Sequence, residues 1–182
     1  MNIPDNIPKI ASRFGVLANK FCAVIDSASN IQRAELLVKV YRMLPTLIGE
    51  AMHLPDVESR DNDGQKIEAN SSRGLLAGAG QHQREWENLY NSMKENLGDW
   101  DSYYKVFDPT QDKEALFGTL ADDIADIYLD LKEGLPFMET HPARPEEAIW
   151  IWRMLFYSHW GKHAMDAMLT IHFRLQNMPD EG

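Results

Sequence analysis

Two histidines near the C-terminal end of the chain, His159 and His163, lie four residues apart, and Asp166 and Thr170 follow at helical spacing. In an α-helix these four side chains share one face. Imidazoles at positions i and i+4 can bind one metal ion between them. The surrounding segment is apolar almost all the way round, which is typical of a helix at the centre of a bundle. The sequence therefore predicts a polar line inside an apolar core.

A second polar line follows the helix expected before it. Thr119, Asp123, Asp126 and Asp130 lie along one edge of an apolar stripe, whereas Asp122 is expected on the opposite, solvated side. Their spacing along the chain matches that of the histidine line. If the two helices pack side by side, the carboxylates and the imidazoles meet in an apolar interior.

Two interpretations of this meeting stay open. The commoner arrangement is a buried hydrogen-bond network that fixes how the two helices pack, because buried polar groups need partners. The other is a site for a divalent metal ion, with carboxylates completing the shell of the histidines. The candidate ligands are His159, His163, Asp123 and Asp126, with Asp166 and Asp130 as residues that hold the ligands in place. The identity of any cofactor stays open.

The elements that must position these residues are helices. Apolar residues at steps of three and four predict five of them, and no stretch alternates as a strand would. They cover residues 8–28, a segment capped by Ser29 or Asn30 that ends near Met52, and residues 80–97, 112–133 and 145–177. Pro45 predicts a kink or break in the second helix. Gly98 and Gly134 are expected to end the third and fourth helices.

These elements predict a single all-α domain over residues 1–182, an antiparallel helical bundle of about five helices. A long polar loop, 54–78, follows the second helix. A loop of this length is uncommon in a compact domain and is often functional.

Composition narrows the class of protein. The 182 residues carry a net charge of −10, and residues 54–147 hold 21 acidic and 9 basic side chains. A nucleic-acid partner is not expected, because it would require a basic surface. Neither a signal peptide nor an apolar run of about 20 residues is evident, so no membrane association is expected and the predicted location is the cytoplasm. The one cysteine, Cys22, is expected to be a buried apolar side chain.

Three segments carry a resemblance to a known family. They are Gly118–Gly134 (GTLADDIADIYLDLKEG), Phe156–Ala164 (FYSHWGKHA) and the aromatic segment ending in Phe107-Asp108-Pro109. Together they resemble the bacterial family known as domain of unknown function 5063. The resemblance implies a helical bacterial protein that stands alone, and it implies no activity and no catalytic residues.

A protein-binding module with an acidic surface is the function that the sequence favours, because no strong catalytic signature accompanies the acidic middle of the chain. Its candidate interface anchors are Trp86, Trp100, Tyr103 and Tyr104. The first alternative is a metal-dependent hydrolase or oxidoreductase that uses the two polar lines. The second, based on charge alone, is an acidic inhibitor or immunity-type protein. The oligomeric state and the identity of the partner stay open.

Overall fold

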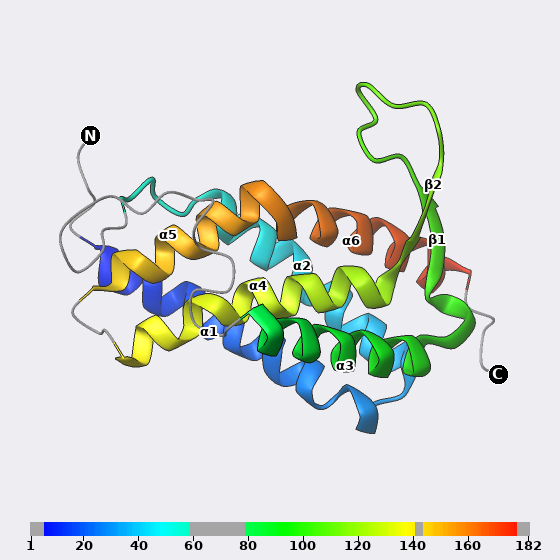
Figure 1. Cartoon of the computed structure of the whole chain (residues 1–182), viewed down its shortest axis with the longest axis horizontal. Helices are drawn as coiled ribbons and strands as arrows, with labels where there is room; N and C mark the ends of the chain where they lie inside the picture. The colour runs from blue at the N-terminus through cyan, green and yellow to red at the C-terminus, as the bar shows by residue number, and fades with distance from the viewer. Residues whose placement is uncertain (1–5, 59–78, 141–143, 178–182) are drawn as a thin grey trace.

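The computed structural model of the chain describes residues 6–58, 79–140 and 144–177, a part that is mostly helical. The helices are α1 (Ile7–Asp26), α2 (Arg33–Met52), α3 (Ala79–Leu97), α4 (Leu120–Thr140), α5 (Pro145–Leu155) and α6 (Gly161–Gln176), and the strands are β1 (Ser102–Lys105) and β2 (Leu116–Thr119). A π-helix, Phe156–Trp160, joins α5 to α6, so that these helices form one long rod. The helical architecture expected from the sequence is therefore present. The all-α class is wrong in one respect, since the chain also forms a small two-stranded sheet (Figure 1).

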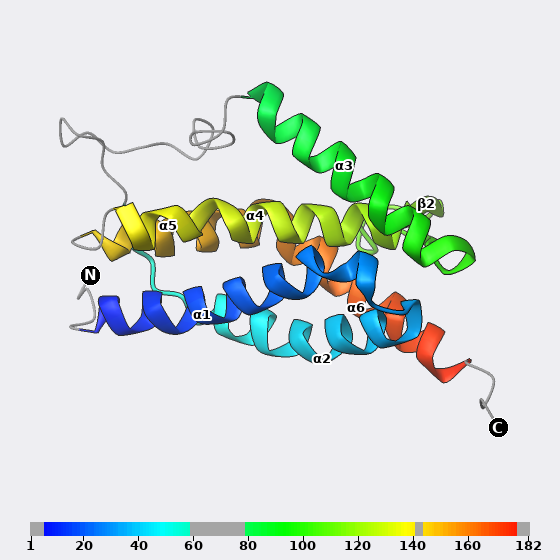
Figure 2. The same cartoon turned by 90° about the horizontal axis from the view of Figure 1, so that it is seen from below.

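Helix α4 lies at the centre of the molecule, where it contacts α1, α3, α5 and α6. Figure 2 shows α1 and α2 on one side of α4 and α3 on the other. In the same view α3 crosses α4 obliquely and diverges from it towards the N-terminal end of α3. Because α4 has neighbours on several sides, the carboxylates along it lie within the protein rather than on an outer helix.

The apolar core is built around Trp152, whose side chain is fully buried. Its ring packs against Phe14, with 4.9 Å between the ring centroids, and its indole N–H donates to the carbonyl oxygen of Leu131 at 2.8 Å. The ring also lies against Gly134, where a Cβ would overlap the indole. This close approach explains the glycine at position 134, which makes room for the indole and does not end α4 as predicted. The helix instead continues through Gly134 and Pro136 to Thr140.

The fourth helix also begins later than the predicted residue 112. Helix α4 starts at Leu120, and its first turn is held by Asp101, which lies only 2% exposed. The Asp101 side chain accepts a hydrogen bond from the backbone N–H of Ala121 at 2.8 Å, and its carbonyl oxygen accepts one from Leu120 at 2.9 Å. A side chain that caps a helix stabilises its otherwise unpaired N–H groups. This cap comes from far upstream, so local sequence could not reveal it.

Residues 102–119 form a β-hairpin rather than the start of a helix. Strands β1 and β2 are antiparallel, with Tyr104 opposite Phe117 and Tyr103 opposite Gly118. The hairpin extends beyond the helices in Figure 1. Tyr104 is 78% exposed on its outer side, whereas Lys105 and Tyr103 are half-buried and reach α4. The hairpin thus brings two polar side chains to the centre of the molecule.

The remaining helix boundaries give a mixed result. Helix α3 ends before Gly98 as predicted, and Gly98 adopts a positive φ of 56°. Helix α2 continues through Pro45 without a break. Gln32 occupies its N-cap position, so the predicted caps Ser29 and Asn30 are wrong, and both lie in a 3₁₀ turn, Ala28–Asn30.

Three further expectations concern segments outside the site. Of the predicted 54–78 loop, residues 59–78 lie outside the described residues, while Leu54 and Val57 are buried in the core. Cys22 is buried as expected, and burial raises the pKa of its thiol to about 12. In the part of the chain that the structure describes, no helix has the length and apolar character needed to cross a bilayer.

The packing at Gly134 gives a stability prediction. We expect Gly134→Ala to lower the free energy of unfolding by about 2 kcal/mol, because the new methyl group would displace the Trp152 indole. Gly49→Ala is the matched control, since no atom lies within 4 Å of a Cβ built there. Alanine favours a helix by up to about 1 kcal/mol over glycine, so this variant should be equal to or more stable than the wild type. Urea denaturation of both variants measures the difference, and equal stabilities would contradict the packing described.

Candidate metal centre

Helix α4 and the α5–α6 rod bring the two predicted polar lines together. His159 Nδ1 lies 2.7 Å from Asp130 Oδ2, and His163 Nδ1 lies 2.8 Å from Asp123 Oδ1. The lower-numbered aspartate pairs with the higher-numbered histidine, so α4 and the rod run in opposite directions at this point. Asp123 and Asp130 are 0% and 4% exposed. Each imidazole is therefore held on its Nδ1 side by a buried carboxylate.

Asp126 faces the other side of both imidazole rings. Its Oδ2 atom lies 3.6 Å from His159 Nε2 and 3.3 Å from His163 Nε2. Its Oδ1 atom accepts a hydrogen bond of 2.9 Å from the indole N–H of Trp86, on α3. Trp86 in turn stacks on Tyr90, with ring centroids 4.9 Å apart. One carboxylate oxygen of Asp126 is thus fixed by α3, and the other points at the histidines.

The hydrogen-bond pattern leaves three acceptor atoms facing one another at the centre of this cluster. We assign the Nδ1 protons of His159 and His163 to the bonds with Asp130 and Asp123, because those carboxylates can only accept when ionised. The two Nε2 lone pairs then point at Asp126 Oδ2, which is also an acceptor. Such a group of acceptors is stable only if a proton or a cation lies among them.

The pKa values of Asp126 and His163 reflect this arrangement of acceptors. Burial raises the pKa of Asp126, despite the opposing charges of His163 and His159 and the Trp86 hydrogen bond. Burial alone would lower the pKa of His163, but its hydrogen bond to Asp123 and the charge of Asp126 outweigh burial and raise that pKa. Both shifts favour protonation, so in the metal-free protein the cluster holds protons more firmly than free side chains do.

The same geometry fits a metal ion. Asp126, His159 and His163 each offer one ligand atom, and the three atoms lie within 4.8 Å of one another. In a tetrahedral site with metal–ligand bonds of about 2.1 Å, the ligand atoms are about 3.4 Å apart. The 3.3 and 3.6 Å separations between Asp126 Oδ2 and the two Nε2 atoms match this value. A divalent ion such as zinc therefore fits among these three side chains.

Asp123, predicted as a ligand, supports the cluster from behind His163. It also accepts a hydrogen bond of 2.5 Å from the hydroxyl of Tyr103 and lies 3.5 Å from Lys105 Nζ. Burial and the charge of Asp123 raise the pKa of that tyrosine far above its ordinary value. Asp122 lies close by, since ligand atoms of Asp122, Asp123 and His163 also fall within 4.8 Å of one another. The expectation that Asp122 faces solvent on the opposite side is wrong.

The outer members of the two predicted lines have other roles. Asp166 was predicted to support the metal ligands, but it pairs with Lys162 and Lys105 at 2.7 and 3.0 Å. Thr119 lies in β2, and its hydroxyl accepts a hydrogen bond from the backbone N–H of Asp122 at 3.3 Å. Trp86, Tyr103 and Lys105 complete the cluster, and the spacing of its histidines and aspartates gave no sign of them.

The π-helix sets the direction of His159. A π-helix has a wider turn than an α-helix and is frequent at functional sites. His159 lies within this turn and His163 three residues after it, with their ring centroids 4.9 Å apart. Gly161 follows the π-helix, where a Cβ would overlap the carbonyl oxygen of Phe156. The wide turn thus requires glycine at this position.

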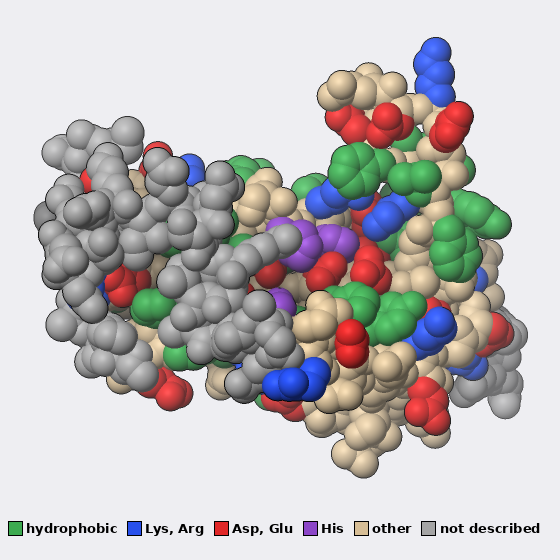
Figure 3. All heavy atoms as spheres, in the orientation of Figure 1, with side chains coloured by type: hydrophobic (Ala, Val, Ile, Leu, Met, Phe, Trp, Pro, Cys, Tyr) green, Lys and Arg blue, Asp and Glu red, His purple; other side chains and the backbone are tan. Residues whose placement is uncertain are grey.

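The cluster is accessible from one face of the molecule. The side chains of His159, Asp126 and His163 are 23%, 17% and 16% exposed. Figure 3 shows histidine side chains at the surface in the middle of this face, next to acidic and basic side chains. A ligand can therefore reach the Nε2 atoms of His159 and His163 and the Oδ2 atom of Asp126 without entering the apolar core.

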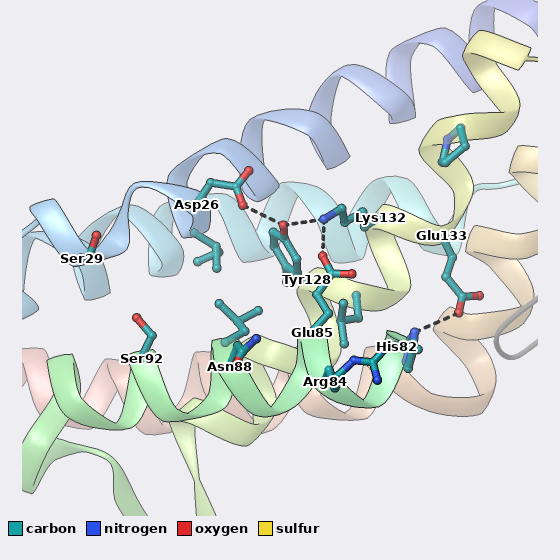
Figure 4. Close-up of a pocket in the computed structure, with 14 residues that line it drawn as sticks. Asp26, Ser29, His82, Arg84, Glu85, Asn88, Ser92, Tyr128, Lys132 and Glu133 are labelled. Atoms are coloured by element: carbon teal, nitrogen blue, oxygen red, sulfur yellow. Dashed lines mark hydrogen bonds and ion pairs between the residues drawn. The ribbon is translucent and has the colours of Figure 1, made fainter. Parts of the chain in front are cut away.

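A separate cavity of about 790 Å³ lies between α1, α3 and α4. Figure 4 shows a chain of hydrogen bonds across it, from Asp26 through the Tyr128 hydroxyl to Lys132 and Glu85. The Tyr128 hydroxyl donates to Asp26 at 2.7 Å and lies 3.0 Å from Lys132 Nζ. These four side chains pair with one another, so none of them faces the cavity without a partner.

The fold and the side chains that meet within it define a helical protein with a His/Asp cluster between two of its helices. The family model of the domain of unknown function DUF5063 matches residues 5–176, so the chain belongs to this family. Its structure is similar to the crystal structure of protein BF1032 from Bacteroides fragilis, with a TM-score of 0.65 and 18% identity. The similarity covers 93% of this chain and 94% of that one, and at this identity it shows the fold alone. No curated protein matches the chain.

The raised pKa of His163 predicts how pH affects the metal-free protein. An unfolded histidine has a pKa of about 6.5, so protonation of His163 stabilises the fold fully below that pH. This contribution is lost as the pH rises through the higher pKa of the folded state. We therefore expect His163→Gln to lower the free energy of unfolding more at pH 6 than at pH 8.5. Urea denaturation with a chelator present measures both losses, and a loss that is equal at the two pH values would contradict the proposed protonation.

Proposed function

We propose that this protein is a metal-dependent hydrolase whose divalent metal ion is bound by Asp126, His159 and His163. The observation that carries the proposal is the convergence of both Nε2 atoms on Asp126 Oδ2, at 3.6 and 3.3 Å. Metal-binding histidines almost always donate their other ring N–H to a carboxylate, carbonyl or water. Asp130 and Asp123 stand in that position for the two histidines.

Three protein ligands favour catalysis over a purely structural role. A structural zinc site has four protein ligands, whereas a catalytic one keeps a position for water or substrate. A metal ion in such a site lowers the pKa of water to about 7 and so supplies a nucleophile at neutral pH. The partial exposure of His159 gives water access to the cluster. Asp122, which has a carboxylate oxygen within 4.8 Å of a ring nitrogen of His163, is the candidate general base.

The competing interpretation is a metal-free network in which protons take the place of the cation. It uses the same contacts, so metal content distinguishes the two. A set of two histidines and one carboxylate also suits iron(II) in oxidoreductases. The metal bound therefore decides between hydrolysis and oxidation within the same site.

The first experiment measures metal content and affinity. We expect protein purified without added metal to contain about one divalent ion per chain, and cobalt to give the visible absorption bands of a tetrahedral complex. His159→Gln, His163→Gln and Asp126→Asn should each abolish stoichiometric binding, because each removes a ligand. Asp130→Asn should weaken the affinity roughly 10- to 100-fold, since it acts through His159.

The matched control is His172→Gln. His172 lies outside the cluster, where its Nδ1 contacts the Tyr41 hydroxyl at 2.9 Å, so this variant should bind metal as the wild type does. Protein that is folded, carries no metal and gains no thermal stability from zinc, manganese, iron or nickel would refute the metal centre and leave the hydrogen-bond network.

A protein-binding role is the second candidate function, and the β-hairpin favours it. Tyr104 and Phe117 are 78% and 65% exposed on its outer side, with ring centroids 6.1 Å apart. Exposed aromatic pairs of this kind are typical anchors of protein interfaces. The acidic surface expected to attract a partner is smaller than the composition suggests, because Asp101, Asp123, Asp130 and Glu147 are buried.

The hairpin gives its own prediction. We expect a protein partner from the native host to bind the wild type and to be lost when Tyr104 and Phe117 are both changed to serine, because the exposed aromatic contact is removed. Tyr157→Ser is the control, since Tyr157 is also exposed, at 62%, but lies in the π-helix. Affinity capture followed by mass spectrometry compares the three proteins. Equal recovery with all of them would exclude the hairpin as the interface.

A further inference from the structure

Two lysines meet at one oxygen atom beside the His/Asp cluster. Lys105 Nζ, from β1, lies 3.0 Å from Asp166 Oδ2, and Lys162 Nζ, from α6, lies 2.7 Å from the same atom. The two side chains are 15% and 35% exposed. Two ammonium groups from separate elements thus converge on one carboxylate oxygen, which shows that an anionic oxygen is stable at this position.

This lysine pair, Lys105 and Lys162, is adjacent to the proposed metal centre. Lys105 Nζ lies 3.5 Å from Asp123 Oδ1, and that same oxygen accepts the hydrogen bond from His163 Nδ1. Only one carboxylate oxygen therefore separates the ammonium group from a proposed metal ligand. Figure 3 shows basic side chains beside the histidines on this face of the molecule.

Lys105 carries charge at neutral pH. Burial lowers the pKa of Lys105, but the nearby Asp123 and Asp166 outweigh burial and raise it. The carboxylates of Asp123 and Asp130 are committed to the Nδ1 atoms of the histidines, on the side away from the metal position. On the face shown in Figure 3, an approaching ligand meets histidine and basic side chains next to one another, and Asp166 lies between the two ammonium groups.

An apolar wall borders the lysine pair. Phe107 is 60% exposed, and Lys162 Nζ lies 5.0 Å from the centroid of its ring. Leu116, opposite Lys105 in the hairpin register, is 46% exposed. Exposed apolar side chains next to a polar centre are typical of sites that bind the organic part of a ligand.

From these observations we propose that the substrates of the metal centre are phosphate esters with an apolar, preferably aromatic, organic group. This inference rests on the proposed function. A phosphate monoester has three terminal oxygens, enough to contact the metal ion and both ammonium groups together, whereas a carboxylate has two. The aromatic group would lie against Phe107 and Leu116. In hydrolysis, the oxygen of water bonds to phosphorus, the ester P–O bond breaks, and the leaving oxygen takes a proton, giving an alcohol and inorganic phosphate.

The test uses the full chain loaded with manganese, and two ligands, phenyl phosphate and inorganic phosphate. The paramagnetic ion broadens the ³¹P resonance of any phosphate that reaches it, and a titration yields the dissociation constant. We expect both ligands to bind, and Lys162→Met to weaken both by about tenfold or more, because it removes a charged hydrogen bond. Lys105→Met should have the same effect. Lys113→Met, an exposed change in the hairpin loop, is the control and should bind as the wild type does.

A further variant separates the two parts of the ligand. Phe107→Ala should weaken the binding of phenyl phosphate and leave the binding of inorganic phosphate unchanged. Benzoate should compete poorly with phenyl phosphate, whereas strong competition by benzoate would assign the site to carboxylates and overturn the proposal.

Manganese content, measured on every variant, distinguishes the possible failures. If the protein holds one manganese ion per chain but the ³¹P resonance of phenyl phosphate is not broadened, the phosphate proposal is overturned and the metal centre remains. The same holds if Lys162→Met and the wild type broaden that resonance equally. A folded wild type that binds no manganese, zinc or iron overturns both. Since Lys162 is partly exposed, its variant gives an answer even if Lys105→Met fails to fold.

Discussion

The structure depends on how it compensates the carboxylates buried along α4. An ionised carboxylate in an apolar interior is stable only with hydrogen-bond donors or a cation beside it. Asp123 and Asp130 each find an imidazole on the α5–α6 rod, and Asp126 finds Trp86 on α3. These contacts fix the relative position of three helices more specifically than apolar packing could, because a shift of one turn would leave charged oxygens without partners.

The amino-acid spacing predicted which of these side chains share a helix face, since Asp123, Asp126 and Asp130 repeat with the period of a helix, as do His159 and His163. That the two lines meet depended on the further assumption that their helices pack side by side, which the structure bears out. The spacing could not reveal which imidazole nitrogen faces which carboxylate, since that depends on the distance and rotation between two helices. It therefore grouped Asp123 with the ligands but could not show that this carboxylate contacts Nδ1 of His163, while Asp126 faces Nε2 of the same ring.

The errors in the predicted fold have a common physical origin, namely contacts between residues far apart in the chain. Asp101 lies directly before β1 and caps the first turn of α4, a role set by its position near Ala121 rather than by its neighbours in sequence. Gly134 has the local appearance of a helix end, but its lack of a side chain makes room for the Trp152 indole. The sequence did not predict that Tyr103 and Lys105 belong to the cluster, because strands of four residues are too short to show a clear alternation of polar and apolar side chains.

The π-helix has a consequence for how related chains can diverge. A turn of this kind holds one residue more than a regular α-helix would, so deleting a residue from 156–160 would restore ordinary hydrogen bonding. Because the wider turn itself takes up the extra residue, α6 would keep its orientation relative to α5, and His163 would stay opposite Asp123 while the position of His159 would change. A gap of one position here, in an alignment of homologues, would therefore mark a lineage in which the two imidazoles no longer converge on Asp126.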